Sequence, residues 1–392
     1  MLRQPATELR VLEQRHTSGA YLKRDLEIVR GEGAIVWDAD GNRYIDCVGG
    51  QGAANLGHAH PAVVSAIQQQ AATLIACPES FHNPVRARYQ AALCAAAGME
   101  RVFLCNSGAE AVEAAIKFAV LATGRMRIVS TMRGFHGRTL GALSATWERS
   151  YREPFAALLP DVVHVPYNNI ERLAGVLDDT IAAVIVEPVQ GEGGVHPAAE
   201  GYLRAVHDRC RQHGALLIVD EIQTGFGRTG TLFACQQEGV IPDLMCLAKS
   251  IGGGIPMGAV LMAEGIGPVP PLTHGSTFGG NPLACAAGLA VLDVLQSSDL
   301  IERARSRGEA VRARLRERLP ERAYREVRGR GLLIGIELRQ KVAPVLRALQ
   351  ERGVLALPAG ASVLRLLPPL VIEDEDLWAV VSAIEEVLNH AA

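Results

Sequence analysis

Short apolar runs alternate with longer amphipathic stretches between residues 61 and about 270. Apolar runs of strand length, bounded by glycine or polar residues, are typical of strands buried on both faces, and the stretches between them have the period of amphipathic helices. Repeated strand–helix units predict a seven-stranded, mostly parallel sheet covered by helices on both faces. The expected strands are Val102–Cys105, Arg127–Thr131, Val162–Val165, Ala182–Val186, Ala215–Val219, Leu244–Leu247 and Ala259–Met262.

The pattern differs at both ends of the chain. Two short strand patterns, Leu26–Arg30 and Ala34–Asp38, precede a glycine-rich bend that ends at Pro61, the expected start of a helix. Beyond about residue 290, a long arginine-rich helix leads to strand patterns at Leu332–Leu338 and Val363–Leu367 and to a closing amphipathic helix. We therefore expect an α/β protein in which both termini build one small α+β domain. The expected divisions are 1–60 (small domain), 61–290 (large domain) and 291–392 (small domain).

Composition narrows the function classes. The 392 residues are 48% hydrophobic and carry a formal net charge of -3, which argues against nucleic acid or an anionic membrane as the main partner. The eight cysteines form no CxxC pair, the first residues lack the apolar centre of a signal peptide, and no apolar run reaches membrane-spanning length. We expect a soluble, cytoplasmic protein. No metal site is expected, because His58 and His60 have no third ligand at suitable spacing.

Two of the expected strands end in side chains that carry chemistry. Ala215–Val219 delivers Asp220, and Leu244–Leu247 leads through one alanine to Lys249, in a chain otherwise poor in lysine. Parallel strands bring such residues to the same edge of a sheet, where open α/β folds bind ligands. The pair favours pyridoxal phosphate chemistry, with a Schiff base at Lys249 and a basic ring nitrogen kept protonated by Asp220. The alternative is a buried ion pair with little effect on stability.

A phosphate site is expected where Val102–Cys105 runs into Asn106-Ser107-Gly108 and a helix begins. Gly108 lets the backbone approach an anion, while Ser107 and the free amides of the helix N-terminus can donate hydrogen bonds to it. A serine that caps an ordinary strand–turn–helix unit is the structural alternative.

Further candidate residues follow other strand ends. Phe135 lies in the glycine-bounded turn GFHGR and can stack on a heteroaromatic ring, and Arg138 can bind a substrate carboxylate. A core phenylalanine and a surface arginine are the alternatives. Glu187 ends a strand, Glu192 lies in a glycine-flanked loop that can approach the cofactor or an arginine, and Gln223 can hydrogen-bond a ring hydroxyl.

Seven motifs, in order along nearly the whole chain, resemble the class III aminotransferases of pyridoxal phosphate fold type I. The motifs are NSGAEAVEAAIK, GFHGRT, EPVQGEGG, VDEIQTGFGRTG, LAKSIGGGIPMGA, HGSTFGGNPLACAA and LRLLPPLVI. The resemblance implies an enzyme that uses pyridoxal 5'-phosphate and a homodimer with shared active sites, in which Thr277 reaches the phosphate of the neighbouring subunit. The cofactor contacts that it implies are Lys249 on the aldehyde, Asp220 on the pyridine nitrogen, Gln223 on the ring hydroxyl, Phe135 on the ring face, and Ser107, Gly108 and Ala109 on the phosphate.

Within this family, FHGRT and QGEGG resemble the acetylornithine and ornithine aminotransferases. Arg365 and Arg138 then match the arginines that bind the two carboxylates of glutamate or 2-oxoglutarate. Glu192 matches the acid that pairs with Arg365 when an amine substrate is bound, and Ser276 belongs to the implied substrate-binding set. An arginine that exchanges its carboxylate partner can serve a diacid and an amine without being left buried and unpaired.

A second set of stretches is more similar to the carrier-protein-linked aminoadipate-semialdehyde transaminases of bacterial lysine synthesis. These stretches are DLEIVRGEGAIVWDADGNRYIDCVGGQGAANLGH, YREPF, EVRGRGLLIGIEL and VLALPAG. They imply amino transfer between glutamate and the terminal carbon of a protected semialdehyde attached to a small acidic carrier protein. Acetylornithine or ornithine in arginine metabolism is the alternative. Gln51 departs from the pattern, because relatives carry an aromatic or aliphatic residue at this pocket edge, so the distal substrate group stays open.

Two other hypotheses stay open on the same sequence. An aminomutase or decarboxylase on this scaffold would need no external amino acceptor. A nicotinamide-binding α/β protein would use Ser107-Gly108 as a dinucleotide phosphate loop, although no GxGxxG follows the first strand.

Overall fold

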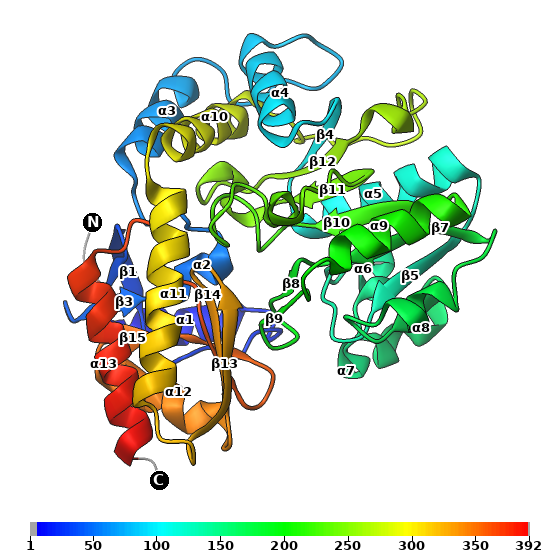
Figure 1. Ribbon diagram of the computed structural model, residues 1–392. Coiled ribbons are helices and arrows are strands. Elements are labelled where there is room, and N and C mark those ends of the chain that lie inside the picture. The colour runs from blue at the N-terminus through cyan, green and yellow to red at the C-terminus, as the bar shows by residue number, and fades with distance from the viewer. Residues whose placement is uncertain (1–5, 391–392) are drawn as a thin grey trace.

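A seven-stranded sheet forms the centre of the structure, a computed structural model that describes residues 6–390 (Figure 1). The strand order is β4-β12-β11-β10-β7-β5-β6. β12 runs antiparallel to both of its neighbours, and the pairs from β11 to β6 are parallel. The strands are β4 (Arg101–Cys105), β5 (Arg127–Thr131), β6 (Val162–Val165), β7 (Ile181–Val186), β10 (Leu216–Asp220), β11 (Leu244–Leu247) and β12 (Gly258–Met262). The predicted α/β fold with a mostly parallel seven-stranded sheet is confirmed.

Alternate side chains of the central strands pack against different helices. In β10, Ile218 belongs to the same apolar cluster as the inner face of α5 (Gly108–Thr123), whereas Leu217 and Val219 belong to the cluster that contains the inner face of α9 (Tyr202–His213). All three side chains are fully buried. The continuous apolar run in the sequence therefore reflects a sheet with two covered faces.

Further helices surround the large sheet. α10 (Pro282–Ser297) packs against α3 (Pro61–Ala71) and α4 (Pro84–Ala97). The helical elements between β5 and α9 are α6 (Leu140–Ala145), α7 (Arg149–Arg152), the 3-10 helix η1 (Glu153–Leu158) and α8 (Ile170–Ala174). The expected domain boundary at residue 290 lies inside α10. We propose the division at the bend of 67° between α10 and α11 (Leu300–Arg318) instead.

Among residues 6–390, no single helix is both long and apolar enough to cross a membrane. Only α10 and α11 taken together meet the length and composition of a span, and they are sharply bent relative to each other.

Both ends of the chain contribute to smaller sheets beside the large one. One sheet has the order β1-β2-β3-β15, in which the late strand β15 pairs in parallel with the early strand β3 through Val354 opposite Ile45. The other has the order β13-β14-β17-β16. Their strands are β1 (Ile28–Glu32), β2 (Ile35–Asp38), β3 (Arg43–Asp46), β13 (Tyr324–Arg330), β14 (Leu333–Leu338), β15 (Val354–Leu355), β16 (Leu357–Ala359) and β17 (Val363–Leu366).

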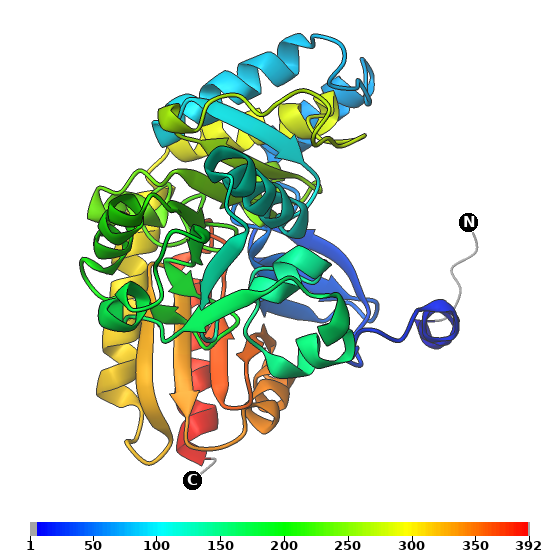
Figure 2. The same cartoon turned by 90° about the vertical axis from the view of Figure 1, so that its right-hand side faces the viewer.

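The helices of the two termini differ in their packing. α12 (Val342–Glu351) and α13 (Asp374–His390) pack together, and α13 also packs on α11. α1 (Ala6–His16) was not expected from the sequence, and Figure 2 shows it, in dark blue, set apart from the rest of the molecule. Leu9, Val11 and Leu12 of this helix are exposed.

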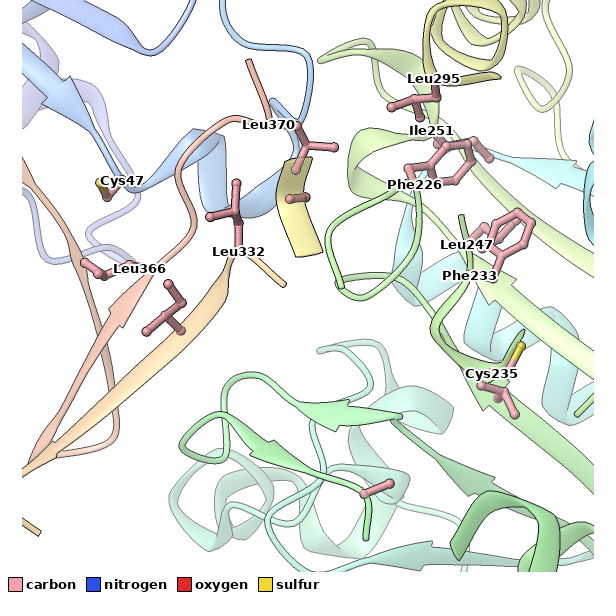
Figure 3. Close-up of a cluster of buried hydrophobic side chains, with 14 of the residues drawn as sticks. Cys47, Phe226, Phe233, Cys235, Leu247, Ile251, Leu295, Leu332, Leu366 and Leu370 are labelled. Atoms are coloured by element: carbon pink, nitrogen blue, oxygen red, sulfur yellow. The ribbon is translucent and has the colours of Figure 1, made fainter. Parts of the chain in front are cut away.

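Apolar side chains fill the junction between the large sheet and the smaller sheets. Figure 3 shows Phe226 and Ile251 on the side of the large sheet, and Leu332 and Leu370 on the side of the smaller sheets. All four are fully buried members of one apolar cluster. The two parts of the molecule therefore meet through a packed interior, and the loops that follow β10 and β11 are part of it.

Candidate active site

Asp220 and Lys249 line the same cavity, of about 280 Å3, at the carboxyl edge of the large sheet. Asp220 is the last residue of β10, and Lys249 lies two residues beyond β11, which runs parallel to β10. Lys249 has a φ of 51°, a left-handed conformation that is sparsely populated by residues with a side chain and often marks a functional position. Burial lowers the pKa of the Lys249 amine, and nearby Arg365 acts in the same direction while Glu192 opposes it. The structure therefore brings together the two residues that the strand ends predict.

His136 contacts the Asp220 carboxylate and holds it in place. The Nδ1 atom of His136 lies 2.7 Å from Oδ2 of Asp220, and the Ile222 amide donates to Oδ1 over 3.0 Å. Both His136 and Asp220 are buried. Burial alone would lower the pKa of His136, but the hydrogen bond and charge of Asp220, together with Glu187, outweigh it and raise that pKa. His136 was not predicted from the sequence, because its role depends on Asp220, which lies 84 positions further along the chain.

The N-terminus of α5 forms one end of the cavity, through Ser107, Gly108 and Ala109. Ser107 caps the helix, because its Oγ accepts the Glu110 amide over 3.2 Å. Gly258 of β12 packs directly on this turn, since a Cβ there would lie 2.3 Å from the Ser107 carbonyl oxygen. The remaining free amides of the first turn are suited to an anion.

Phe135 and Gln223 line the cavity between the helix end and Asp220. The Phe135 amide donates to Oε1 of Glu187 over 2.9 Å, and the Gly191 amide donates to Oε2 over 3.2 Å, so Glu187 connects the two loops. Burial and the charge of Asp220 raise the pKa of Glu187 to about 7 against the opposing effect of His136. The sequence identified Glu187 only as a strand end.

Arg365 and Glu192 form an ion pair beside the cavity. Nη1 of Arg365 lies 2.6 Å from Oε1 of Glu192 and 3.3 Å from Oε1 of Gln223. The Arg365 side chain is 2% exposed, while that of Glu192 is 38% exposed and lines the cavity. Burial would raise the pKa of Glu192, but Arg365 and then Lys249 outweigh it and lower that pKa. An ionised Glu192 thus neutralises a guanidinium that the fold buries.

Besides Arg365, three other sequence candidates, Arg138, Ser276 and Thr277, lie outside the cavity lining. Arg138 is exposed and stacks over the Tyr151 ring, with its guanidinium carbon 3.9 Å from the ring centroid and 5.8 Å from that of Phe135. Ser276 Oγ accepts hydrogen bonds from Nδ2 of Asn106 over 2.9 Å and from the Gly279 amide over 3.0 Å. Thr277 is exposed on the single chain.

A left-handed turn on the small-domain side contacts the loop that carries Lys249. Gly49, Gly50, Gln51 and Gly52 have φ values of 53°, 58°, 62° and 83°, so the predicted glycine-rich bend is a turn of left-handed helix. The hydroxyl of Ser250, next to Lys249, donates to the Gly52 carbonyl over 2.8 Å. Gln51 is exposed and does not line this cavity; it lines a separate hollow together with Arg24 and His58.

The residues present fit pyridoxal phosphate. One cavity joins an anion-binding helix end, a buried carboxylate and an amine, and its intermediate wall is formed by an aromatic ring and an amide side chain. The helix end suits the phosphate of the cofactor, Asp220 suits its ring nitrogen and Lys249 suits its aldehyde. The Phe135 ring suits the face of the cofactor ring, and the Gln223 amide suits the ring hydroxyl.

Comparison with known proteins gives consistent matches over the whole chain. A family model described as aminotransferase class III matches residues 18–388. A LysW-aminoadipate semialdehyde transaminase from Deinococcus radiodurans is 50% identical over 384 residues, covering 96% of this chain and 89% of that protein. An acetylornithine aminotransferase from Methanosarcina acetivorans is 44% identical over 95% of this chain and 94% of its own length. The crystal structure of an ornithine aminotransferase from Toxoplasma gondii superposes with a TM-score of 0.95 at 35% identity, covering 99% of this chain and 96% of that one.

Proposed function

This chain belongs to the class III aminotransferases, which depend on pyridoxal phosphate, and we propose that its amino donor and acceptor pair is glutamate and a carrier-linked semialdehyde. The amino group would move between glutamate or 2-oxoglutarate and the terminal carbon of an N-protected aminoadipate semialdehyde in lysine biosynthesis. The single observation that carries this proposal is the Arg365–Glu192 ion pair at 2.6 Å beside the Lys249 cavity. A buried arginine with an exchangeable acid can serve a diacid and an amine in turn.

Each cofactor-binding residue is proposed to act on a different part of the cofactor or substrate. Pyridoxal phosphate supplies an aldehyde that takes up the amino group and a ring that accepts the electron pair released from the substrate carbon. Asp220, supported by His136, holds a proton on the ring nitrogen. The Nζ atom of Lys249, whose pKa is lowered by burial, takes the proton from the donor carbon. The helix end holds the phosphate through Ser107, Gly108 and Ala109, while Phe135 and Gln223 orient the ring.

The substrate-binding residues are proposed to act in alternation. Arg365 binds the α-carboxylate of glutamate, Arg138 binds the second carboxylate, and Ser276 completes the set near Asn106. When the terminal amine of the other substrate is bound, Glu192 returns to Arg365 and neutralises it. This exchange keeps the buried guanidinium paired in both half-reactions, which avoids the cost of an isolated buried charge.

We propose that two chains form a homodimer with shared active sites. Segments 78–80 and 268–276 line a surface groove of about 760 Å3, and the nearby Phe81, Leu272 and Phe278 are 65%, 103% and 64% exposed. Large apolar side chains gathered in this way are typical of a contact surface. Thr277 is exposed and lies between Ser276, which lines this groove, and the exposed Phe278, which supports its proposed contact with the phosphate in the partner subunit.

The carrier and the compartment are also part of the proposal. The name of the Deinococcus relative includes LysW, which supports a carrier-linked substrate for this chain. We propose a small acidic carrier protein as the partner that presents the amine. The eight cysteines are free, which supports a reducing cytoplasm.

Arginine metabolism supplies the second candidate function. Acetylornithine aminotransferases at 44% identity support acetylornithine as the amine substrate. The higher identity to the LysW-linked enzyme, 50%, favours the carrier-linked substrate.

Half-reaction spectroscopy of the holoenzyme tests these alternatives. We expect the cofactor absorbance to change with glutamate and with the carrier-linked amine, and to change more slowly with acetylornithine, ornithine or free lysine. Faster conversion by acetylornithine than by the carrier-linked amine would assign the chain to the arginine pathway. Turnover of an amine with no requirement for 2-oxoglutarate would identify an aminomutase or a decarboxylase instead.

A further inference from the structure

Arg228 is a fully buried arginine outside the cavity, bound by three separate segments of the chain. Its Nη2 donates to Oδ1 of Asn55 over 2.6 Å, and its Nη1 donates to the carbonyls of Leu332, over 3.1 Å, and Pro368. The backbone adds to this contact, because the Leu332 amide donates to the Arg228 carbonyl over 3.0 Å. One side chain therefore joins a loop of the large sheet to three segments of the small-domain side.

The charge of Arg228 has no carboxylate partner within ion-pair distance among residues 6–390. Burial lowers the pKa of its guanidinium to about 9, and Cys47 opposes this shift. Desolvation of an arginine bound only by neutral acceptors costs free energy that a hydrophobic residue of similar size would avoid. What the guanidinium supplies and a hydrophobic residue cannot is a planar set of donors with fixed directions.

The loop that carries Arg228 and two of the three segments that Arg228 binds carry or support a residue of the site. Arg228 itself follows Gln223 by five positions in the loop that begins at Asp220. Pro368 follows Arg365 by three positions, at the end of β17.

Asn55 connects its own segment to the loop that carries Arg228. Its Nδ2 donates to the Phe226 carbonyl over 2.8 Å, and its own carbonyl accepts the Leu370 amide over 2.7 Å. The left-handed turn that contacts the Lys249 loop ends three residues earlier, at Gly52. Asn55 and Arg228 therefore form one buried unit, which we term the Arg228 bracket.

We propose that the Arg228 bracket is a positioning device for substrate carboxylates: it fixes Arg365 relative to Gln223 and Lys249. Arg365 lies in β17 and Gln223 lies in the loop after β10, and the two side chains are in contact at 3.3 Å, so their separation depends on how firmly β17 is held against that loop. The bracket joins these two segments directly. Its loss should move the carboxylate-binding guanidinium while the cofactor residues, which stand on the large sheet, stay in place.

This inference rests on the proposed function, because it assumes that Arg365 binds glutamate. The test uses Arg228→Lys in the holoenzyme, with Asn55→Ala as a second variant that leaves the arginine intact. Arg125→Met is the matched control, because Arg125 also donates to two backbone carbonyls, of Ile181 and His213, and lies outside the cavity lining. Glutarate, a dicarboxylate that cannot react, is used as the binding probe in calorimetry.

We expect Arg228→Lys to weaken glutarate binding and to raise KM for glutamate about tenfold, with kcat and the cofactor absorbance nearly unchanged. Asn55→Ala should also raise the dissociation constant for glutarate and the KM for glutamate, whereas Arg125→Met should change neither. In an Arg365→Ala background, Arg228→Lys should have no further effect on glutarate binding.

Two results would overturn the inference. One is wild-type affinity for glutarate in folded Arg228→Lys and Asn55→Ala proteins. The other is an equal loss in the glutamate and the amine half-reactions. A wild-type protein that binds glutarate but does not react with glutamate would instead contradict the proposed function, so the two failures are distinguishable.

Discussion

The cofactor side and the substrate side of the cavity are built in different ways. The residues proposed to hold the cofactor stand at the carboxyl ends of β4, β10 and β11, and Asp220 is further held by His136. The residues proposed to hold substrate come from β17, from the loop that contains Glu192 and from an exposed turn that contains Arg138. The first set serves both half-reactions unchanged, whereas the second must bind two different molecules in turn. Rigid placement suits the former, and an exchangeable ion pair suits the latter.

On the substrate side of the cavity, the part of the protein that can change conformation is small. The loop around Glu192 is fixed by Arg328, whose Nε donates to the Gly194 carbonyl over 2.9 Å. Gly193 is packed so closely that a Cβ would lie 2.2 Å from the Arg133 carbonyl oxygen. We therefore expect rotation of the partly exposed Glu192 side chain, rather than movement of its loop, to release Arg365.

Replacement of Lys249 should have the largest effect, because it removes the amine that both half-reactions share. We expect Lys249→Ala to abolish transamination and the visible absorbance of the enzyme-bound cofactor. Lys117→Ala is the control, since Lys117 is exposed and its amine contacts His274 at 3.1 Å. Normal turnover in Lys249→Ala would contradict the assignment of the cofactor side.

Arg365→Ala should separate the two sides of the cavity. Removal of a buried charge that binds a carboxylate costs about 2–5 kcal/mol, so we expect the glutamate half-reaction to slow by about 10²- to 10³-fold. The amine half-reaction should slow less, because there Arg365 binds only Glu192. Stopped-flow absorbance with each substrate measures both rates. An equal loss in the two would mean that Arg365 supports the whole site rather than one substrate.

The pH dependence of the free energy of unfolding of the apo-protein should show whether His136 stabilises the Asp220 carboxylate. The pKa of His136 is raised, so its charged form contributes stability that is fully present below about pH 6.5 and is lost as the pH rises through the higher folded-state pKa. We expect His136→Phe to destabilise the protein by about 1–3 kcal/mol at pH 6 and by less at alkaline pH. Denaturant unfolding across this pH range measures the difference.

The conservative variant His136→Asn keeps a donor for Asp220 but cannot be charged. It should recover part of the stability and lose the part of the pH dependence that His136 contributes. A wild-type profile in His136→Phe would show that the histidine does not support the carboxylate in its charged form.

The sequence predicted the cofactor side better than the substrate side, for a physical reason. Asp220, Ser107 and the strands that carry them follow from local apolar runs and a helix start, so a short window of sequence contains the signal. Arg365 contacts Gln223 across 142 positions, and only a resemblance to known proteins pointed to it. The sequence around Arg228 and His136 contains no such signal, because their roles depend on Asn55 and Asp220, which the fold brings close from distant positions.

The smaller sheets were also predicted incompletely. β13 was missed because it is the edge strand of its sheet, and its sequence, YREVRGR, lacks the apolar alternation of a half-buried strand. β15 and β16 are too short for any period to be read. The left-handed conformation of Gln51 could not be foreseen, since residues with a side chain rarely adopt it.

Ser107→Ala should have the smallest effect and sharpen the contrast between structural and ligand-binding roles. Loss of an N-cap typically costs about 1 kcal/mol, so we expect that loss in the free energy of unfolding of the apo-protein. Asn83→Ala is the matched control, because Asn83 caps α4 by accepting the Val85 and Arg86 amides, each over 3.0 Å, and does not line the cavity. Both variants should lose similar stability, but only Ser107→Ala should also lower cofactor affinity, as measured by titration of the apo-protein. Equal cofactor affinity in the two variants would reduce Ser107 to a helix cap and leave phosphate binding to the backbone amides of α5.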